Sequence, residues 1–427
     1  MADHPRSEGD APLPALRSDL DAFPVEHEGK PVFVLDDREG LSGRVMALSP
    51  GGMLVASLLD GRHTADELCA IVAEHAGAPV DAADIRKIVE ELEGADLLET
   101  ERVRAKRRKI LEDFKTSPVR KAVMSGAGYP ESALELAGLF GGFMRDPKGP
   151  GKALPERPAS APPPLGLVSP HIDFQRGGPA YAWAYQALAE SPPPDLIVAL
   201  GVAHAGPKSP WIMTPKAYET PHGPMAVDSG LYDEIAGCLW YDPRDDEWAH
   251  RREHSLEAQA VWLRFLWREK TPPWVPILCS SFERFSPDRP PSSVSTIEGA
   301  IEKIGDKLAA RAKGGQRIMV LAGVDLAHVG PRFGDDIALD AGLEKRIETE
   351  DRGSLEHALR LDADEFYRST IAGGHWRKVC GLSALYTSLR WIKALSPDGR
   401  PPGELLTYAQ SYDPLGGIVS YVSAIFR

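Results

Sequence analysis

The second half of the chain repeats one pattern, in which short apolar runs alternate with stretches of helical spacing from Leu165 to Arg427. The apolar runs, each typical of a buried strand, are LGLVSPH, DLIVALGVAH, PWVPILCSSF, RIMVLAGVDLAH, ELLTYAQSYD and GGIVSYVSAIF. The helical stretches between them include HSLEAQAVWLRFLW and GLSALYTSLRWIKAL. Because strands that alternate with helices build α/β folds, we predict an α/β domain of about 260 residues over residues 165–427.

A smaller unit is predicted upstream, over residues 25–105. PVFVLDD reads as a strand, and GGMLVASLLDG reads as a short helix. Thr64 and Glu67 form the pattern of a capping box before ADELCAIVAEHAG, and Asp81 is placed to cap AADIRKIVEELEG. ADLLET then reads as a short strand. Short helices flanked by strands are typical of a small α+β winged-helix domain. We expect the polar residues 1–24 before it to be a disordered tail.

The phrases LLDGRHTADEL and VDAADIRKIVEELEGADLLE resemble the PqqD-like family of small winged-helix domains. That resemblance implies a peptide or a radical SAM enzyme as the partner of the N-terminal region. The alternative is a purely structural helical cap. A role in reading DNA is disfavoured, because the last helix of this unit carries four acidic residues, Asp84, Glu90, Glu91 and Glu93.

Residues 106–164 are predicted to be a helical connector and a proline-rich linker between the two domains. The connector begins within the basic run ERVRAKRRKILEDFKTSPVRKAV, which could contact phosphate but is more typical of a solvated helix face. ALPERPASAPPPLG has the composition of a stiff linker and marks the predicted domain boundary. The tract over residues 115–151 has no clear period and is not assigned.

Charge and composition exclude several classes of protein. The net charge of -13 argues against a general binder of nucleic acid or of membrane surfaces, which would need a basic footprint. The chain has no apolar run of about 18 residues and no apolar core of the signal-peptide type at its start. Its four cysteines are far apart and form no CxxC pair, which is typical of a reducing compartment. We therefore expect a soluble, cytoplasmic protein.

Polar side chains follow three of the predicted strands. LGLVSP leads into His171, DLIVALGVA leads into His204, and RIMVLAGV leads into Asp325, with His328 just beyond. The carboxyl ends of strands line the ligand crevice of an open α/β sheet, so these groups should meet. Cys380 precedes a predicted helix, whose N-terminus favours a thiolate. Two histidines and a cysteine leave a fourth metal position open, as in catalytic zinc sites, and resemble the two-histidine, one-carboxylate iron site with a thiolate substituted.

Seven ordered segments resemble the MEMO family, also called AmmeMemoRadiSam system protein B, over residues 165–427. They are SPHIDF, LGVAHAG, TPHGPMAVD, EHSLEAQ, VDLAHVGPRFG, CGLSAL and TYAQSYD. Members of this family look structurally like class III extradiol dioxygenases, a nonhaem-iron enzyme group. The resemblance implies the same fold and a bound metal, with iron first and copper or zinc as alternatives.

The same resemblance implies roles for individual residues. It assigns metal binding to His171, His204 and Cys380, and acid–base work to His254, Asp325 and His328. Three further residues are predicted to contact substrate, namely Asp173, His222 and Glu257. Asp173 stands where the family usually has a small residue, so it could also join the metal shell or orient His171 as a hydrogen-bond acceptor.

Two hypotheses of function remain open at this point. The first is a metal-dependent redox enzyme of the extradiol-dioxygenase type. A cysteine ligand would donate more charge than a carboxylate, which puts ring cleavage in doubt. The second is a non-catalytic partner protein that binds a metal or a peptide and recruits a peptide or a radical SAM enzyme through the PqqD-like domain.

Overall fold

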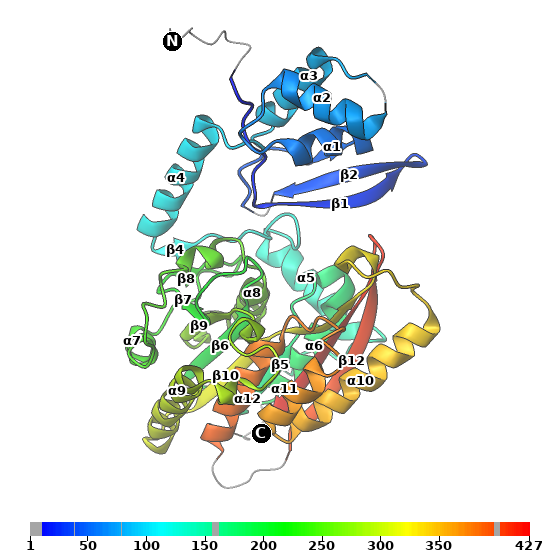
Figure 1. Ribbon diagram of the computed structural model, residues 1–427. Helices are drawn as coiled ribbons and strands as arrows, with labels where there is room; N and C mark the ends of the chain where they lie inside the picture. The colour runs from blue at the N-terminus through cyan, green and yellow to red at the C-terminus, as the bar shows by residue number, and fades with distance from the viewer. Residues whose placement is uncertain (1–10, 38, 78, 156–161, 397–401) are drawn as a thin grey trace. The chain divides into compact units, whose positions relative to one another are not determined.

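The computed structural model describes residues 11–37, 39–77, 79–155, 162–396 and 402–427 (Figure 1). The chain divides into two compact units, an N-terminal unit, Met1–Thr116, and a C-terminal unit, Ser117–Arg427. Within the described ranges, no helix combines the length and the apolar character that a membrane span requires.

The described part of the N-terminal unit combines a small antiparallel sheet with four helices. Its strands lie in the order β1-β2-β3. The elements are β1 (Leu20–His27), β2 (Lys30–Asp37), β3 (Met46–Leu48), α1 (Pro50–Leu58), α2 (Ala65–Ala76), α3 (Ala82–Gly94) and α4 (Glu101–Thr116). Leu35, Leu68 and Leu92 lie in its own apolar core. The unit therefore has a core that needs no residue from the rest of the chain.

The predicted helix starts in this unit are confirmed. Thr64 and Glu67 form both halves of the capping box of α2, and the Asp81 side chain accepts a hydrogen bond from Ala83 N at the start of α3. The predicted strand ADLLET is wrong, because only Leu98 pairs there, in an isolated bridge with Leu16. Residues 11–24 also differ from the predicted tail, since Leu16 packs against the core and β1 begins at Leu20. Residues 1–10 lie outside the described residues.

The boundary between the units falls earlier than predicted. Residues 106–116 complete α4, whereas the tract from residue 117 onward belongs to the C-terminal unit. There β4 (Val119–Arg120) pairs with β8 (Ala217–Tyr218), and α5 (Ala133–Arg145) packs on α6 (Phe174–Ala189). The proline-rich segment, of which residues 156–161 lie outside the described residues, does not mark the boundary.

The basic face of α4 is held by carboxylates of its own unit. Arg107 contacts Glu99 at 2.9 Å, Glu39 at 2.8 Å and Asp19 at 3.3 Å, and Lys106 contacts Asp96 at 3.0 Å. The predicted helix is therefore present. Part of its basic face forms ion pairs with carboxylates of the same unit instead of being only solvated.

An eight-stranded mixed sheet forms the centre of the described part of the C-terminal unit. The strand order is β11-β13-β5-β10-β6-β9-β7, with β12 on β13, and the four strands β5, β10, β6 and β9 are mutually parallel. The bounds are β5 (Gly166–Ser169), β6 (Leu196–Val202), β7 (Trp211–Met213), β9 (Trp274–Cys279), β10 (Ile318–Gly323), β11 (Asp325–Val329), β12 (Glu404–Asp413) and β13 (Gly417–Phe426). All six predicted runs contain strands, and RIMVLAGVDLAH contains two of them.

Helices cover both faces of this sheet (Figure 1). Alternate residues of β6 feed two buried clusters, because Ile197 points to one face and Val198 to the other. The first face is covered by α5, α6 and α8, and the second by α7, α9, α10, α11 and α12. The remaining helix bounds are α7 (Ser229–Ala236), α8 (Ser255–Trp267), α9 (Ser295–Lys313), α10 (Ala341–Leu359), α11 (Ala363–Ile371) and α12 (Leu382–Leu395). Short 3-10 turns lie at Glu247–Arg251, Arg268–Lys270, Phe282–Arg284, Pro291–Ser293 and Pro331–Phe333.

Candidate metal centre

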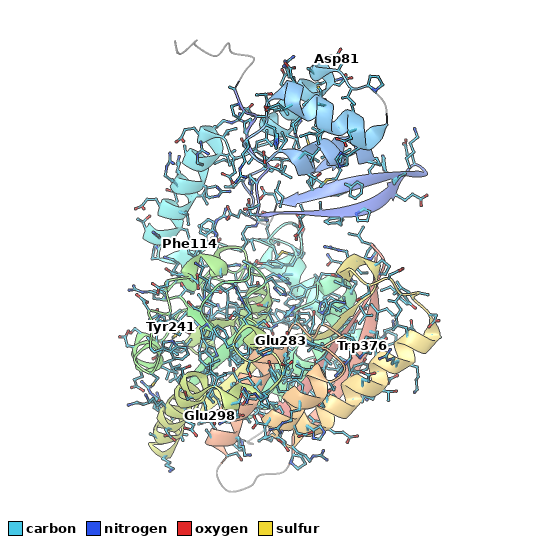
Figure 2. The ribbon with its side chains drawn as sticks, in the orientation of Figure 1. Asp81, Phe114, Tyr241, Glu283, Glu298 and Trp376 are labelled. Carbon is cyan, nitrogen blue, oxygen red and sulfur yellow. The ribbon has the colours of Figure 1, made fainter. Side chains whose placement is uncertain are left out.

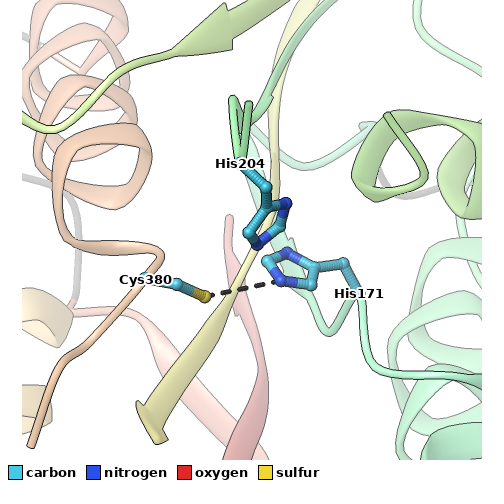
Figure 3. A group of neighbouring side chains, drawn as sticks. All are labelled: His171, His204 and Cys380. Atoms are coloured by element: carbon cyan, nitrogen blue, oxygen red, sulfur yellow. Dashed lines mark hydrogen bonds between the residues drawn. The ribbon is translucent and has the colours of Figure 1, made fainter. Parts of the chain in front are cut away.

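Three neighbouring strands deliver the predicted residues to one edge of the sheet. His171 follows β5 and His204 follows β6, and β10 lies between these two strands and leads into Asp325. Cys380 arrives from the turn before α12, and Figure 3 shows its side chain directed at the two histidine rings. The parallel register of the central strands therefore brings together residues that are far apart in sequence.

One glycine lets the cysteine come this close. A Cβ atom at Gly381 would lie 2.5 Å from Val324 Cβ and 2.6 Å from the Asp325 carbonyl oxygen. No side chain fits that gap, so the turn that carries Cys380 can lie against the β10–β11 junction only with glycine at position 381.

The ligand-type atoms of His171, His204 and Cys380 all lie within 4.8 Å of one another. Cys380 Sγ is 3.4 Å from His171 Nε2, the contact drawn as a dashed line in Figure 3. The two imidazole rings are 5.1 Å apart and perpendicular. The side chain of His171 is 3% exposed and that of His204 is 40% exposed, so the cluster is open from the His204 side.

Hydrogen bonds fix which nitrogen each histidine presents. His171 Nδ1 lies 3.0 Å from the Gly323 carbonyl oxygen, to which it donates. His204 Nδ1 lies 3.0 Å from the Glu253 carboxylate. With Nδ1 protonated and engaged in both rings, a neutral imidazole carries its free lone pair on Nε2. This second layer of acceptors is the usual support of histidine metal ligands.

The Glu253 carboxylate supports His204 in the candidate site. Besides His204 Nδ1, its carboxylate accepts the backbone N–H groups of His204 at 3.1 Å and Ser255 at 2.9 Å. Burial raises the pKa of this carboxyl, but His204 outweighs burial and holds the pKa well below its usual range. The only sequence signal was its position next to His254 in the EHSLEAQ segment.

The electrostatics of the cluster favour a thiolate. Burial raises the pKa of Cys380, but His171 and His328 oppose it, and the pKa is lowered to about 5. Burial lowers the pKa of His171, whereas Asp325 and Cys380 raise it, with a net value of about 9. Burial likewise lowers the pKa of His204, and Glu253 raises it well above its usual range. A thiolate at neutral pH is the form of cysteine that binds metals.

Two of the predicted acid–base residues, His254 and Asp325, join this cluster. The His254 ring stacks on His204 with centroids 5.2 Å apart, and burial lowers its pKa to about 4. Asp325 accepts the backbone N–H of His171 at 2.9 Å, and its other oxygen is 3.6 Å from His171 Nε2. His254 is therefore neutral at pH 7 and placed beside the ligands, where it can accept a proton.

The third predicted acid–base residue, His328, lies on β11 at the border of the cluster. Its Nδ1 is 3.1 Å from the Leu326 carbonyl oxygen, and its ring meets Phe333 edge-on.

Asp173 was predicted to join the metal shell or to orient His171, but its hydrogen bonds go elsewhere. Its carboxylate caps α6 by accepting Arg176 N at 3.0 Å, and it pairs with Arg176 Nε at 2.6 Å. The Gly-Gly-Pro stretch over residues 177–179 lies inside α6.

Two predicted substrate contacts, Glu257 and His222, lie elsewhere. Glu257 is fully buried, and its carboxylate receives Arg120, the Tyr129 hydroxyl at 2.7 Å and two backbone N–H groups of residues 123 and 124. It is a structural anchor because these four donors occupy both of its oxygens. His222 lies beside Arg264, Arg268 and Phe265, which is a separate basic cluster.

Sequence reasoning also missed the contribution of residues 120–129. Met124, Gly128 and Tyr129 line a cavity of about 30 Å³ together with Asp173, His171, Ile172, Phe174, His254 and Ala258. This segment came from the tract without a clear period, and nothing in its sequence marked it as a wall of the site.

The donor set fits a transition metal. Two imidazole nitrogens and one thiolate suit zinc, copper and iron, whereas calcium and magnesium prefer oxygen ligands. A second set, His204, Glu253 and His254, also lies within ligand distance. In that set the contact from His204 to Glu253 is an ordinary hydrogen bond, so the first set is the better candidate.

The fold and the cluster together define a mixed α/β protein with a possible metal site at the carboxyl edge of its sheet, joined to a small β/α unit. Residues 120–425 match the model of the Memo-like protein family, and the chain belongs to that family. The match begins at residue 120 rather than at the predicted residue 165. Residues 32–98 match the family described as coenzyme PQQ synthesis protein D (PqqD).

Several relatives are similar over most of their length. A MEMO1 family protein of Aquifex aeolicus is 25% identical over 92% of this chain and 96% of its own length. A MEMO1 family protein of Methanopyrus kandleri is 29% identical over 72% of this chain and 99% of its own length. One from Thermus thermophilus is 29% identical over 70% of this chain and 81% of its own length.

Proposed function

We propose that the C-terminal unit binds a redox-active metal, most simply Fe(II), through His171, His204 and Cys380, and acts on an oxygen-rich substrate as an enzyme related in fold to class III extradiol dioxygenases. The observation that carries this proposal is the pair of hydrogen bonds from the Nδ1 atoms to Gly323 and Glu253, which direct both Nε2 atoms to where Cys380 Sγ lies. When bound, the metal would supply a Lewis acid and an electron-transfer centre.

The protein side chains then have distinct tasks. Glu253 orients His204, and Asp325 holds the backbone of His171. His254, neutral at pH 7, takes a proton from a substrate hydroxyl that comes within hydrogen-bond distance. The open position beside His204, which is 40% exposed, leaves room for that substrate.

The test is the metal content of protein purified anaerobically with iron. We expect one metal per chain in the wild type and its loss in His171→Ala, His204→Ala and Cys380→Ala, whereas His222→Ala keeps it. Oxygen consumption with a panel of catechols then separates an enzyme from a binder. A wild-type protein without stoichiometric metal overturns the proposal.

A second candidate function is favoured by the PqqD match over residues 32–98. We propose that the N-terminal unit recruits a peptide or a radical SAM enzyme, which would supply or process what the C-terminal unit handles. Capture of such a partner should be lost when residues 1–116 are deleted, with the metal content unchanged. Capture that survives this deletion contradicts the proposed recruitment.

A further inference from the structure

A second hollow adjoins the cysteine of the candidate metal centre. It measures about 300 Å³, and its lining includes Val202, Glu283, His375, Lys378, Cys380 and Leu382. The cavity on the His171 side holds only about 30 Å³, the space of a single water molecule. Ligand pockets begin at about 300 Å³, so of these two spaces only the one beside Cys380 can hold an organic molecule.

One carboxylate, that of Glu283, belongs to the lining of this pocket. Glu283, labelled in Figure 2, lies on the loop after β9 and is one-third exposed, and its Oε1 is 2.8 Å from His375 Nδ1. His375 Nε2 accepts the backbone N–H of Val379 at 2.9 Å, so this nitrogen carries no proton. His375 therefore orients the Glu283 carboxylate by donating from Nδ1, and this hydrogen bond lowers the pKa of Glu283, so the group is ionised at neutral pH.

The backbone holds this arrangement firmly. His375 has a φ of 53° and Lys378 a φ of 47°, both in the left-handed region that non-glycine residues rarely adopt. Such conformations persist where the surrounding structure over-determines them, and they are common at ligand sites. The same segment ends at Cys380, so the histidine that contacts the Glu283 carboxylate and the candidate metal ligand lie five residues apart on one stretch of chain.

Among the described residues, Lys378 is the one lysine or arginine in the lining of this pocket, and it is already paired. The Lys378 ammonium contacts the Asp335 carboxylate, which lies outside the pocket lining. Arg284, the neighbour of Glu283, donates to the carbonyl oxygens of Gly206 and Pro207 and is not part of the lining. Apart from the candidate metal ligand Cys380, the charged side chain of this lining that is left to meet a ligand is Glu283, and Val202 and Leu382 add apolar surface to the same lining.

We propose that this pocket selects a small substrate that carries a protonated amine at the end opposite its metal-binding oxygens, with Glu283 as the residue that recognises the ammonium group. This inference rests on the proposed function, because the oxygen donors of the substrate are placed at the His171, His204 and Cys380 centre. His375 is a positioning residue that orients Glu283.

The test uses three catechols of matched size and different charge, measured on the full-length, zinc-loaded protein by calorimetry without oxygen. Dopamine is cationic, 4-ethylcatechol is neutral, and 3-(3,4-dihydroxyphenyl)propanoate is anionic. We expect dopamine to bind about tenfold more tightly than 4-ethylcatechol, as one charge-assisted hydrogen bond implies, and the anion to bind least. In Glu283→Gln the three affinities should converge, whereas Glu302→Gln, an exposed change on α9, keeps the order.

Salt provides a readout that needs no variant. If a charge pair sets the preference, raising KCl from 20 mM to 500 mM narrows the ratio of dopamine to 4-ethylcatechol affinity in the wild type. Equal affinities, tighter binding of the anion, a preference that survives Glu283→Gln, or no binding of any catechol at 10 mM each overturn the inference. If the three catechols bind with affinities that do not depend on their charge, the proposed metal chemistry is not contradicted. A wild-type protein that takes up no metal overturns the proposed metal chemistry. In that case the ratio of dopamine to 4-ethylcatechol affinity, measured on the metal-free protein, tests the proposed role of Glu283 by itself.

Discussion

At the scale of single residues, Glu253 connects the fold to the candidate metal centre. Its carboxylate accepts from the ring of His204 and from two backbone N–H groups, while its own carbonyl oxygen accepts from Arg120 at 2.5 Å. The ring of His204 is therefore oriented by a side chain that cannot move without breaking several hydrogen bonds. Outer acceptors of this kind commonly affect metal affinity without touching the metal.

Replacing Glu253 with glutamine should weaken metal binding while leaving all three ligands in place. The amide keeps the size of the side chain but removes the negative charge that favours His204 Nδ1–H as the donor. We expect a loss of about 10- to 100-fold in metal affinity, measured by competition with a chelator. Unchanged affinity in Glu253→Gln, or an equal loss in the exposed control Glu302→Gln, contradicts this role.

A buried histidine beside the site predicts how stability depends on pH. His250 is fully buried, with the Tyr218 hydroxyl 2.7 Å from Nδ1 and the Ile212 carbonyl oxygen 3.0 Å from Nε2. Burial lowers its pKa to about 3. Because the unfolded histidine titrates near pH 6.5, protons favour the unfolded chain below that pH, and the stability contributed by neutral His250 is present above pH 6.5 and lost towards pH 3.

The expected size of this effect is a fall of about 2 kcal/mol in the free energy of unfolding between pH 7.5 and pH 5. His250→Gln keeps a donor for Ile212 but does not titrate, so its free energy of unfolding should fall by about that much less over the same range. Denaturant unfolding of both proteins at several pH values measures the difference. If the free energy of unfolding of the two proteins changes equally with pH, His250 is not the source of the pH dependence.

At the scale of secondary-structure elements, the short strand β4 fastens the start of the C-terminal unit to the loop that carries the site. Arg120 is fully buried and donates to Glu257, to the Glu253 carbonyl oxygen at 2.5 Å and to the His250 carbonyl oxygen at 2.9 Å. Its guanidinium also lies 4.9 Å above the Tyr218 ring. One side chain of β4 therefore fixes both ends of the segment over residues 250–257.

Removing one partner of the buried pair should be costly. In Arg120→Met the Glu257 carboxylate stays buried without its cation, and we expect a loss of about 3 to 5 kcal/mol in the free energy of unfolding. The double variant Arg120→Met/Glu257→Gln should lose less than the sum of the two single variants. Lys121→Met, which breaks an exposed pair with Glu219, is the matched control and should cost less than about 1 kcal/mol. Strict additivity of the two buried changes would contradict the coupling.

The sequence predicted the elements whose signal is local and periodic. Buried strands and capped helices were predicted correctly, and the strand-end rule brought His171, His204 and Asp325 together. The role of Glu257 was not predictable, because its partner Arg120 lies 137 residues away and reads as one more base in a basic run. The start of the C-terminal unit was predicted too late for a different reason. The short strand β4 and the glycine-containing helix α5 carry little periodic signal.

At the scale of the whole molecule, each unit has its own core. The apolar cluster around Leu35 and Leu68 lies within the N-terminal unit, and those around Val198 and Trp262 lie within the C-terminal unit. All three candidate metal ligands belong to the C-terminal unit. A ligand that binds only one folded unit stabilises that unit by mass action, and it leaves the other unchanged when the two unfold separately.

Metal should therefore shift only one of two thermal transitions of the full-length chain. At a free metal concentration of 100 times Kd the stabilisation is about 2.7 kcal/mol, which raises the Tm of a unit of this size by a few degrees. We expect calorimetry to resolve two transitions, with the Tm of the C-terminal unit raised by metal and that of the N-terminal unit constant. Cys380→Ala should abolish the shift without removing either transition. A single transition would mean that the two units unfold as one, and a metal-dependent shift in both transitions would mean that their stabilities are coupled. In either case a change at the metal centre would reach the N-terminal unit through that shared stability.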